Sequence, residues 1–185
     1  MENSKLRKYI FATIALIKKQ AFQAKEKVGS LVGAPTTYNT GLLMGYAHIL
    51  KDFRNYTIAL WIDRKDLGLA DIEPEADLLG MKSNPEADRR IKDMIEPLTE
   101  EKVEGYIYDL MTILKETAME EQAQLDDPAT SDDNGFDRGY LMAYYQIFST
   151  MQDQAVLFGI DQKACNLSII DPDRDLLPSL LKEKK

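Results

Sequence analysis

The chain has 185 residues, of which 44% are hydrophobic and 29% are charged, as in an ordinary globular protein. Its 31 acidic and 23 basic side chains give a net charge of −8, which disfavours binding to nucleic acids or anionic membranes, because both need a basic surface. A single cysteine, Cys165, excludes an intrachain disulfide and a thiolate metal cluster. There is no signal-peptide pattern and no run of about 20 apolar residues, so we expect a cytoplasmic protein.

The first helix is predicted over residues 4–28. Its apolar residues recur at three- and four-residue steps and therefore share one face: Leu6, Tyr9, Ile10, Ile14, Ile17, Ala21, Ala24 and Val28. Gly29 is expected to end this helix, and the stretch 30–37, which contains glycine and proline, is expected to be a loop.

A second, longer helix is predicted from about residue 39 to residue 61, because the helical step continues there without a proline. Gly41 and Gly45 lie one turn apart on it. Each glycine lowers helix propensity by ~1 kcal/mol relative to alanine. We therefore expect a packing reason for them, namely that another helix approaches closely at this point.

Short elements are predicted after the second helix. Asp63 is expected to cap a single turn that ends at Gly68. Glu73-Pro74 combines a capping residue with proline at the first helical position, which predicts a brief helix. Gly80 is expected to end that helix, and Asp171-Pro172 predicts a similar start near the C-terminus.

The connecting segment 81–98 is predicted to hold one helix, because Asn84-Pro85 repeats the combination of a capping residue and proline. Long helices are predicted to follow at residues 99–124 and 136–158. Between them lies the acidic stretch 126–135, which we expect to be a loop.

The segment Gly41–Gly80 occurs twice. Shifted by 98 positions it aligns without a gap with Gly139–Pro178, and 14 of the 40 pairs are identical, where chance would give ~2–3. The identical positions in the first copy are Gly41, Leu43, Met44, Tyr46, Ile49, Ile62, Asp63, Lys65, Leu69, Ile72, Pro74, Asp77, Leu78 and Leu79. The first helix matches the third at an offset of 97. The repeating unit is therefore a helix, a loop, a long helix and short turns.

The repeat predicts an all-α fold: an internally duplicated helical bundle, in which two helical hairpins are related by a pseudo-twofold axis and short accessory helices are added. Residues 1–185 would form one domain. In it, residues 4–80 are the first repeat, 81–98 the connecting helical segment, 99–178 the second repeat and 179–185 a charged tail.

Two groups of residues are candidates for a functional site. The first is a partner surface on the acidic loop and the exposed faces of the long helices; its loop residues are Asp126, Asp127, Asp132 and Asp133, which would attract a basic partner. The second is a pocket between the repeats, lined by Tyr46, His48 and Tyr144. The competing interpretation of the tyrosines is core packing, since aromatic residues at helical spacing usually pack.

The sequence favours a protein that is not an enzyme. It contains no phosphate-binding loop, nucleophile elbow, His-Glu-x-x-His helix or nucleotide fingerprint, and its one histidine has no recognisable acid–base partner. We expect no cofactor. The favoured hypothesis is an interaction module, such as an inhibitor, an immunity-type protein or an adaptor, that binds a basic protein. The alternatives are a bundle that binds a small molecule or a metal ion between the repeats, and self-association.

Overall fold

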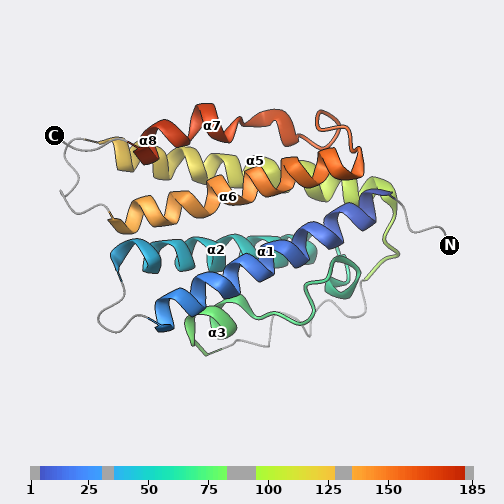
Figure 1. The fold of residues 1–185 in the computed structure, drawn as a ribbon. Helices are drawn as coiled ribbons and strands as arrows, with labels where there is room; N and C mark the ends of the chain where they lie inside the picture. The colour runs from blue at the N-terminus through green and yellow to red at the C-terminus, as the bar shows by residue number, and fades with distance from the viewer. Residues whose placement is uncertain (1–4, 31–35, 83–94, 128–134, 182–185) are drawn as a thin grey trace.

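The computed structural model describes residues 5–30, 36–82, 95–127 and 135–181, and these ranges contain helices and turns but no strand. The elements are α1 (Lys5–Ser30), α2 (Thr37–Ala59), η1 (Arg64–Leu67), α3 (Pro74–Leu79), α5 (Glu100–Asp126), α6 (Gly135–Phe158), η3 (Leu167–Ile169), α7 (Pro172–Asp175) and α8 (Leu177–Leu181). The four long helices pack together, α2 and α6 most extensively (Figure 1). The predicted all-helical bundle is confirmed.

The long helices bury the apolar faces that their spacing predicts. The wholly buried apolar side chains of the two outer helices are Tyr9, Ile10, Ile14, Ile17 and Ala21 in α1, and Tyr106, Ile107, Leu110, Met111, Leu114 and Ala118 in α5. Burial of a large apolar side chain stabilises a fold by about 1.5–3 kcal/mol before conformational entropy is subtracted. These two faces therefore hold α1 and α5 onto the α2–α6 pair.

Threonine caps begin two of the long helices. The side chain of Thr36 accepts a hydrogen bond from the backbone N–H of Asn39 at 3.2 Å, so that α2 begins two residues before its predicted start. The side chain of Thr99 accepts one from the N–H of Lys102, also at 3.2 Å, and begins α5 as predicted. Each cap satisfies a backbone donor that the first turn of a helix leaves without an intrahelical partner.

Three helix ends differ from the predicted ones. The predicted stop at Gly29 is wrong, because α1 continues to Ser30 and Gly29 does not adopt the positive φ of a C-terminal glycine cap. Helix α2 ends at Ala59, two residues early, since Trp61 has φ of 53° and has left the right-handed helical region. Helix α5 continues two residues further than predicted, to Asp126.

Helices α2 and α6 approach each other closely at their glycines. A Cβ atom at Gly41 would lie 1.9 Å from the carbonyl oxygen of Phe136, and a Cβ atom at Gly139 would lie 2.0 Å from that of Tyr38. Ordinary van der Waals contact of a Cβ atom begins at 3.4 Å. Neither position therefore accepts a larger residue unless a helix backbone moves, which explains the predicted need for glycine in these helices.

One buried tyrosine in each outer helix, Tyr9 in α1 and Tyr106 in α5, connects that helix to a long helix in the other half of the chain. The hydroxyl of Tyr9 in α1 donates to the carbonyl oxygen of Met151 in α6 at 3.0 Å. The hydroxyl of Tyr106 in α5 donates to the carbonyl oxygen of Phe53 in α2 at 2.8 Å. A hydrogen bond of this kind contributes about 0.5–1.5 kcal/mol. The first half of the chain (residues before 81) is thus interlocked with the second half (residues from 99).

The turns that follow α2 and α6 are built alike. Asp63 accepts a hydrogen bond from the backbone N–H of Lys65 at 3.0 Å, as its predicted capping role requires, and Asp161 makes the corresponding bond at 2.9 Å. Five residues later each turn adopts a left-handed conformation, with φ of 74° at Gly68 and 57° at Asn166. Glycine adopts this conformation without strain, and asparagine tolerates it better than most residues do.

The short helices α3 and α7 begin at the predicted proline residues, Pro74 and Pro172. Gly80, with φ of 67°, ends α3 as predicted. In the second half two short helices follow in place of one, α7 and then α8. Pro178 has no N–H to donate to the preceding turn, which explains the interruption.

Two predicted elements concern residues that are only partly described. The predicted helix that begins at Asn84-Pro85 falls mostly outside the described residues, and residues 95–99 are not helical. Of the segment predicted as a tail, Ser179 and Leu180 belong to α8 and are buried. Within the described ranges, none of the helices combines the length and the apolar character that a membrane crossing requires.

Candidate functional site

The residues of the predicted pocket lie along the contact between α2 and α6. Tyr46 and Tyr144 are core residues, 1% and 0% exposed, whereas His48 lies at the surface. A Cβ atom at Gly45 would lie 2.6 Å from the Cβ atom of Ala143, so the two helices are in contact one residue before Tyr46. The three predicted residues therefore share one contact, but the tight packing of the helices leaves little room between them.

The hydroxyl groups at this contact differ in their hydrogen bonding. The Tyr46 hydroxyl donates to Oε1 of Gln146 at 2.6 Å. Nδ1 of His48 is hydrogen-bonded to the Tyr140 hydroxyl. The Tyr144 hydroxyl is buried and makes no hydrogen bond of ordinary geometry with the described residues, but it interacts with the neighbouring Tyr140 hydroxyl. Buried polar groups usually have a well-formed partner, so the poor geometry at this hydroxyl is the observation that favours a ligand site here.

Half-buried carboxylates surround His48 on three helices. Burial raises the pKa of Asp52 in α2, against the positive charges of His48 and Lys51. Burial also raises the pKa of Glu121 in α5, and the negative charge of Asp137 in α6 raises it further. Asp52 lies one helical turn from His48 in the sequence, whereas sequence reasoning missed Glu121 and Asp137, because only helix packing brings them near it.

Cys165 does not have the surroundings of a nucleophile. It is buried, and burial together with the negative charges of Glu104 and Asp161 raises the pKa of its thiol to about 11. The thiol is therefore uncharged near neutral pH, and it is the thiolate that reacts. In the part of the chain that the structure describes, no group of three or more His, Cys, Asp or Glu residues could hold a metal ion.

The structure describes two of the four aspartates of the predicted partner surface. Asp126 is the last residue of α5, and its Oδ2 accepts a hydrogen bond from the Ser179 hydroxyl of α8 at 2.8 Å. Asp127 caps the helix and is exposed. Asp132 and Asp133 lie outside the described residues. Asp126 thus helps to hold α8 against α5 as well as contributing charge to the surface.

Helix α5 carries a larger acidic surface than this loop, with eight acidic and two basic side chains along its length. Its acidic face consists of Glu101, Glu104, Tyr108, Glu116, Met119 and Glu120, all of them exposed. Tyr108 and Met119 are 48% and 39% exposed, which is unusual for large apolar side chains. A depression of about 320 Å³ lies beside this face, and Lys115 and Ile169 line it together with the acidic residues Glu116 and Glu120.

Helix α1 has the opposite charge, with seven basic side chains and one acidic one. Its basic face consists of Lys8, Phe11, Ala15, Lys19 and Phe22, all exposed and spaced so that they follow one side of the helix. The two phenylalanines are 49% and 41% exposed. The outer helices of the two halves therefore each present exposed apolar side chains among charges, and the charges are of opposite sign.

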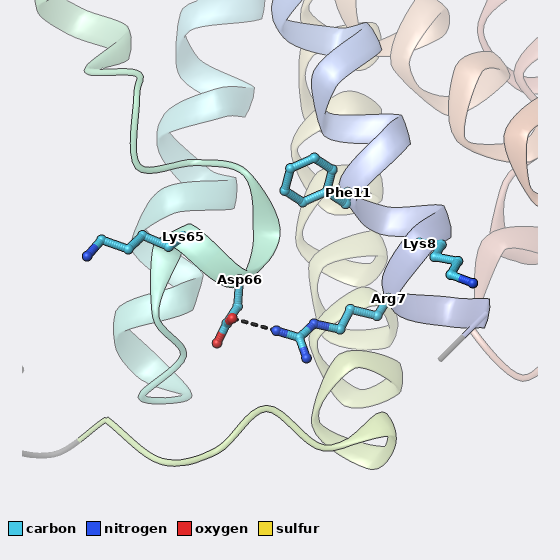
Figure 2. Close-up of a pocket in the computed structure, with 5 residues that line it drawn as sticks. All are labelled: Arg7, Lys8, Phe11, Lys65 and Asp66. Atoms are coloured by element: carbon cyan, nitrogen blue, oxygen red, sulfur yellow. Dashed lines mark hydrogen bonds and ion pairs between the residues drawn. The ribbon is translucent and has the colours of Figure 1, made fainter. Parts of the chain in front are cut away.

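Depressions of about 320 and 270 Å³ adjoin Phe11 between α1 and η1. Figure 2 shows Phe11 on the side of α1 that faces η1, and the guanidinium of Arg7 paired with Asp66 at 2.5 Å. The side chains of Lys8 and Lys65 extend away from this pair. The charge of Arg7 is thus used to hold the turn against α1, while the two lysines lie at the edges of the depression.

Comparison with known proteins assigns no function to these features. No known protein family, curated protein or solved structure matches this chain. The two charged faces and the buried tyrosines are therefore the features from which a function can be inferred.

Proposed function

We propose that this chain is a non-enzymatic interaction protein, of the inhibitor, immunity or adaptor type, that binds a basic segment of a partner on the acidic face of α5. The observation that supports this most is the alternation of carboxylates with Tyr108 and Met119 on one exposed helix face. Apolar side chains in the middle of a surface provide binding energy, and the charges around them select a partner of opposite charge. The single cysteine suits a reducing compartment such as the cytoplasm.

We also propose that the two halves arose by duplication and are related by a pseudo-twofold axis. The contacts of Gly41 with Phe136 and of Gly139 with Tyr38 support this, because both residues of the first contact lie 98 positions from those of the second. The tyrosine hydrogen bonds are paired in the same way, since each joins an outer helix to the long helix of the other half. On this proposal the core has kept its symmetry, whereas the outer surfaces have diverged in charge.

Affinity capture from a lysate of the native cell would test the interaction, with three forms of the full chain as bait. We expect a stoichiometric partner that binds the unchanged protein and leaves at high salt. The variant Glu116→Lys/Glu120→Lys should no longer capture this partner. The variant Lys8→Glu/Lys19→Glu, which changes the charge in the opposite direction on the basic face of α1, should still capture it. Capture that is unaffected by reversal at Glu116 and Glu120 would rule out the acidic face. Reversal of Asp132 and Asp133 to lysine tests the loop in the same way.

The buried hydroxyl of Tyr144, which interacts with the Tyr140 hydroxyl but makes no hydrogen bond of ordinary geometry, favours a second candidate function, a small-molecule site between the halves. A ligand that binds only the folded state raises stability by RT ln(1 + [L]/Kd), so thermal shifts with metabolites and metal ions would detect it. A shift that disappears in Tyr144→Phe and persists in Tyr46→Phe would support this site, because the Tyr46 hydroxyl already has a protein partner. Equal shifts in both variants would place the ligand elsewhere.

A further inference from the structure

We propose that the acidic face of α5 binds the basic face of α1 on a second copy of this chain, so that copies associate head to tail. This inference rests on the proposed function and names its partner. The partner it requires is a basic helix with exposed apolar side chains, and α1 has those properties. The net charge of −8 for the whole chain does not show that α1 and α5 are complementary in charge, because the basic and acidic side chains are concentrated on different helices.

The two faces match at four of the five positions of the basic face. At an offset of 97 residues, three uncharged residues of the basic face align with uncharged residues of α5 and Lys19 aligns with a residue of opposite charge, while Lys8 aligns with Gly105. The aligned pairs are Phe11 with Tyr108, Ala15 with Thr112, Lys19 with Glu116, and Phe22 with Met119. Both faces thus have a smaller residue near the middle and a large apolar residue on either side of it, and in α5 the Thr112 hydroxyl also accepts a hydrogen bond from the Asn166 side chain at 3.0 Å. Lys19 and Glu116 would add attraction where like charges would repel.

The positions of the faces decide what kind of assembly forms. In the view of Figure 1, α1 crosses in front of α2, while α5 runs behind α6. A copy that binds a neighbour through α1 therefore keeps its own α5 face available for a third copy. An interface between two different surfaces of one chain is heterologous, and it produces an open chain of copies unless the rotation closes a ring.

The association should be weak and sensitive to salt. One helix face offers less surface than the roughly 800 Å² per partner that a stable complex buries. The charges of both faces are exposed, so salt screens them, with a Debye length of about 10 Å at 0.1 M and about 3 Å at 1 M. We expect the weight-average mass to rise above 21.0 kDa between micromolar and millimolar protein at low salt, and to return to that value in about 1 M salt.

The decisive experiment uses two charge-reversed variants of the full chain, Lys19→Glu and Glu116→Lys, in sedimentation at low salt. Each variant alone has one damaged face and should remain monomeric. In a 1:1 mixture, the intact acidic face of the first can bind the intact basic face of the second. The mixture should then form species of at least twice the monomer mass, because the intact faces pair and the two reversed charges are also opposite in sign to each other. Asp153→Lys and Lys82→Glu, exposed positions outside both faces, should associate like the unchanged protein.

The possible failures are distinguishable. If the unchanged protein stays monomeric up to millimolar concentration, the second copy is not the partner, and the proposed function stands as long as capture from lysate still depends on Glu116 and Glu120. If the unchanged protein associates and neither reversal affects it, the association uses other surfaces and the inference is overturned. A mixture of the two variants that remains monomeric overturns it as well, because each variant supplies one intact face.

Discussion

Replacement of Gly41 by alanine would test the closest contact of α2 with α6. On an unobstructed helix this change stabilises by about 1 kcal/mol. Here the added methyl carbon would lie 1.9 Å from the carbonyl oxygen of Phe136 and 2.7 Å from its carbonyl carbon, where ordinary contact begins at 3.4 Å. The helices would have to separate by about 1.5 Å, and overpacking of this kind costs about 1–3 kcal/mol or more. Because backbone cannot rotate away as a side chain can, we expect the upper end, a net loss of about 2 kcal/mol.

The assay is urea unfolding followed by circular dichroism, with Gly105→Ala as the matched control. Gly105 also lies within a long helix, but a Cβ atom there would have nothing within 4 Å. That variant should gain up to about 1 kcal/mol. Gly41→Ala should also melt about 4–8 °C lower than the unchanged protein, since a domain of this size loses about 2–4 °C per kcal/mol.

The double variant Gly41→Ala/Gly139→Ala adds a second criterion. One separation of α2 from α6 relieves both clashes, so the loss in the double variant should be smaller than the sum of the two single losses. Equal stabilities of Gly41→Ala and Gly105→Ala would refute the close contact. Additive losses would show that the two glycines do not share one helix contact.

Three further predictions concern the core, a strained backbone position and a titrating carboxylate. Tyr9→Phe and Tyr106→Phe should each lower the free energy of unfolding by about 1 kcal/mol, as each removes a buried hydrogen bond; a loss in only one of them would show that the two contacts are not equivalent. Trp61→Gly should be more stable than Trp61→Ala by about 0.5–1 kcal/mol in thermal melts, because alanine keeps the cost of a φ of 53°; equal stabilities would argue against that conformation. The raised pKa of Asp52 means that the folded state holds its proton to higher pH than the unfolded state does, so this group lowers stability as pH rises from its ordinary pKa through the raised one. The stability gained in Asp52→Asn should therefore increase over that range in a pH series and then level off; a gain that is independent of pH would exclude this cause.

Local signals predicted most of the elements, because caps and turns are set by residues close in sequence. Thr99, Asp63 and Gly68 all have their predicted roles. The positive φ of Trp61 was not predicted, because tryptophan rarely adopts this conformation; the signal was its alignment in the repeat with Gly159, which has φ of 56°. Gly29 shows the opposite case: a glycine permits a helix to end but does not force it to.

The candidate sites were harder to predict than the helices. The glycines of α2 predicted a close helix contact, while Tyr46 and Tyr144 predicted a pocket at the same place, and close contact leaves little room for a pocket. Of the carboxylates near His48, Asp52 lies four residues further along the same helix and could have been predicted, whereas Glu121 and Asp137 come from other helices and gave no signal in sequence. The charges of α1 and α5 did give a signal in the sequence. A count of charged residues for each helix would have shown that α1 is basic and α5 is acidic, whereas the net charge of the whole chain combines the two.

The proposed duplication connects the paired contacts of the core with the difference in charge between the two outer surfaces. A symmetric ancestor would have had two identical outer faces, and identical charged faces on separate copies repel each other. A change of sign on one face removes that repulsion and makes the two faces complementary, but only for a heterologous contact, because each copy then carries one face of each kind. The core is not free to change in this way, since a larger residue at Gly41 or Gly139 would meet a backbone. On this argument Lys19 and Glu116 mark where two structurally equivalent helices acquired different roles.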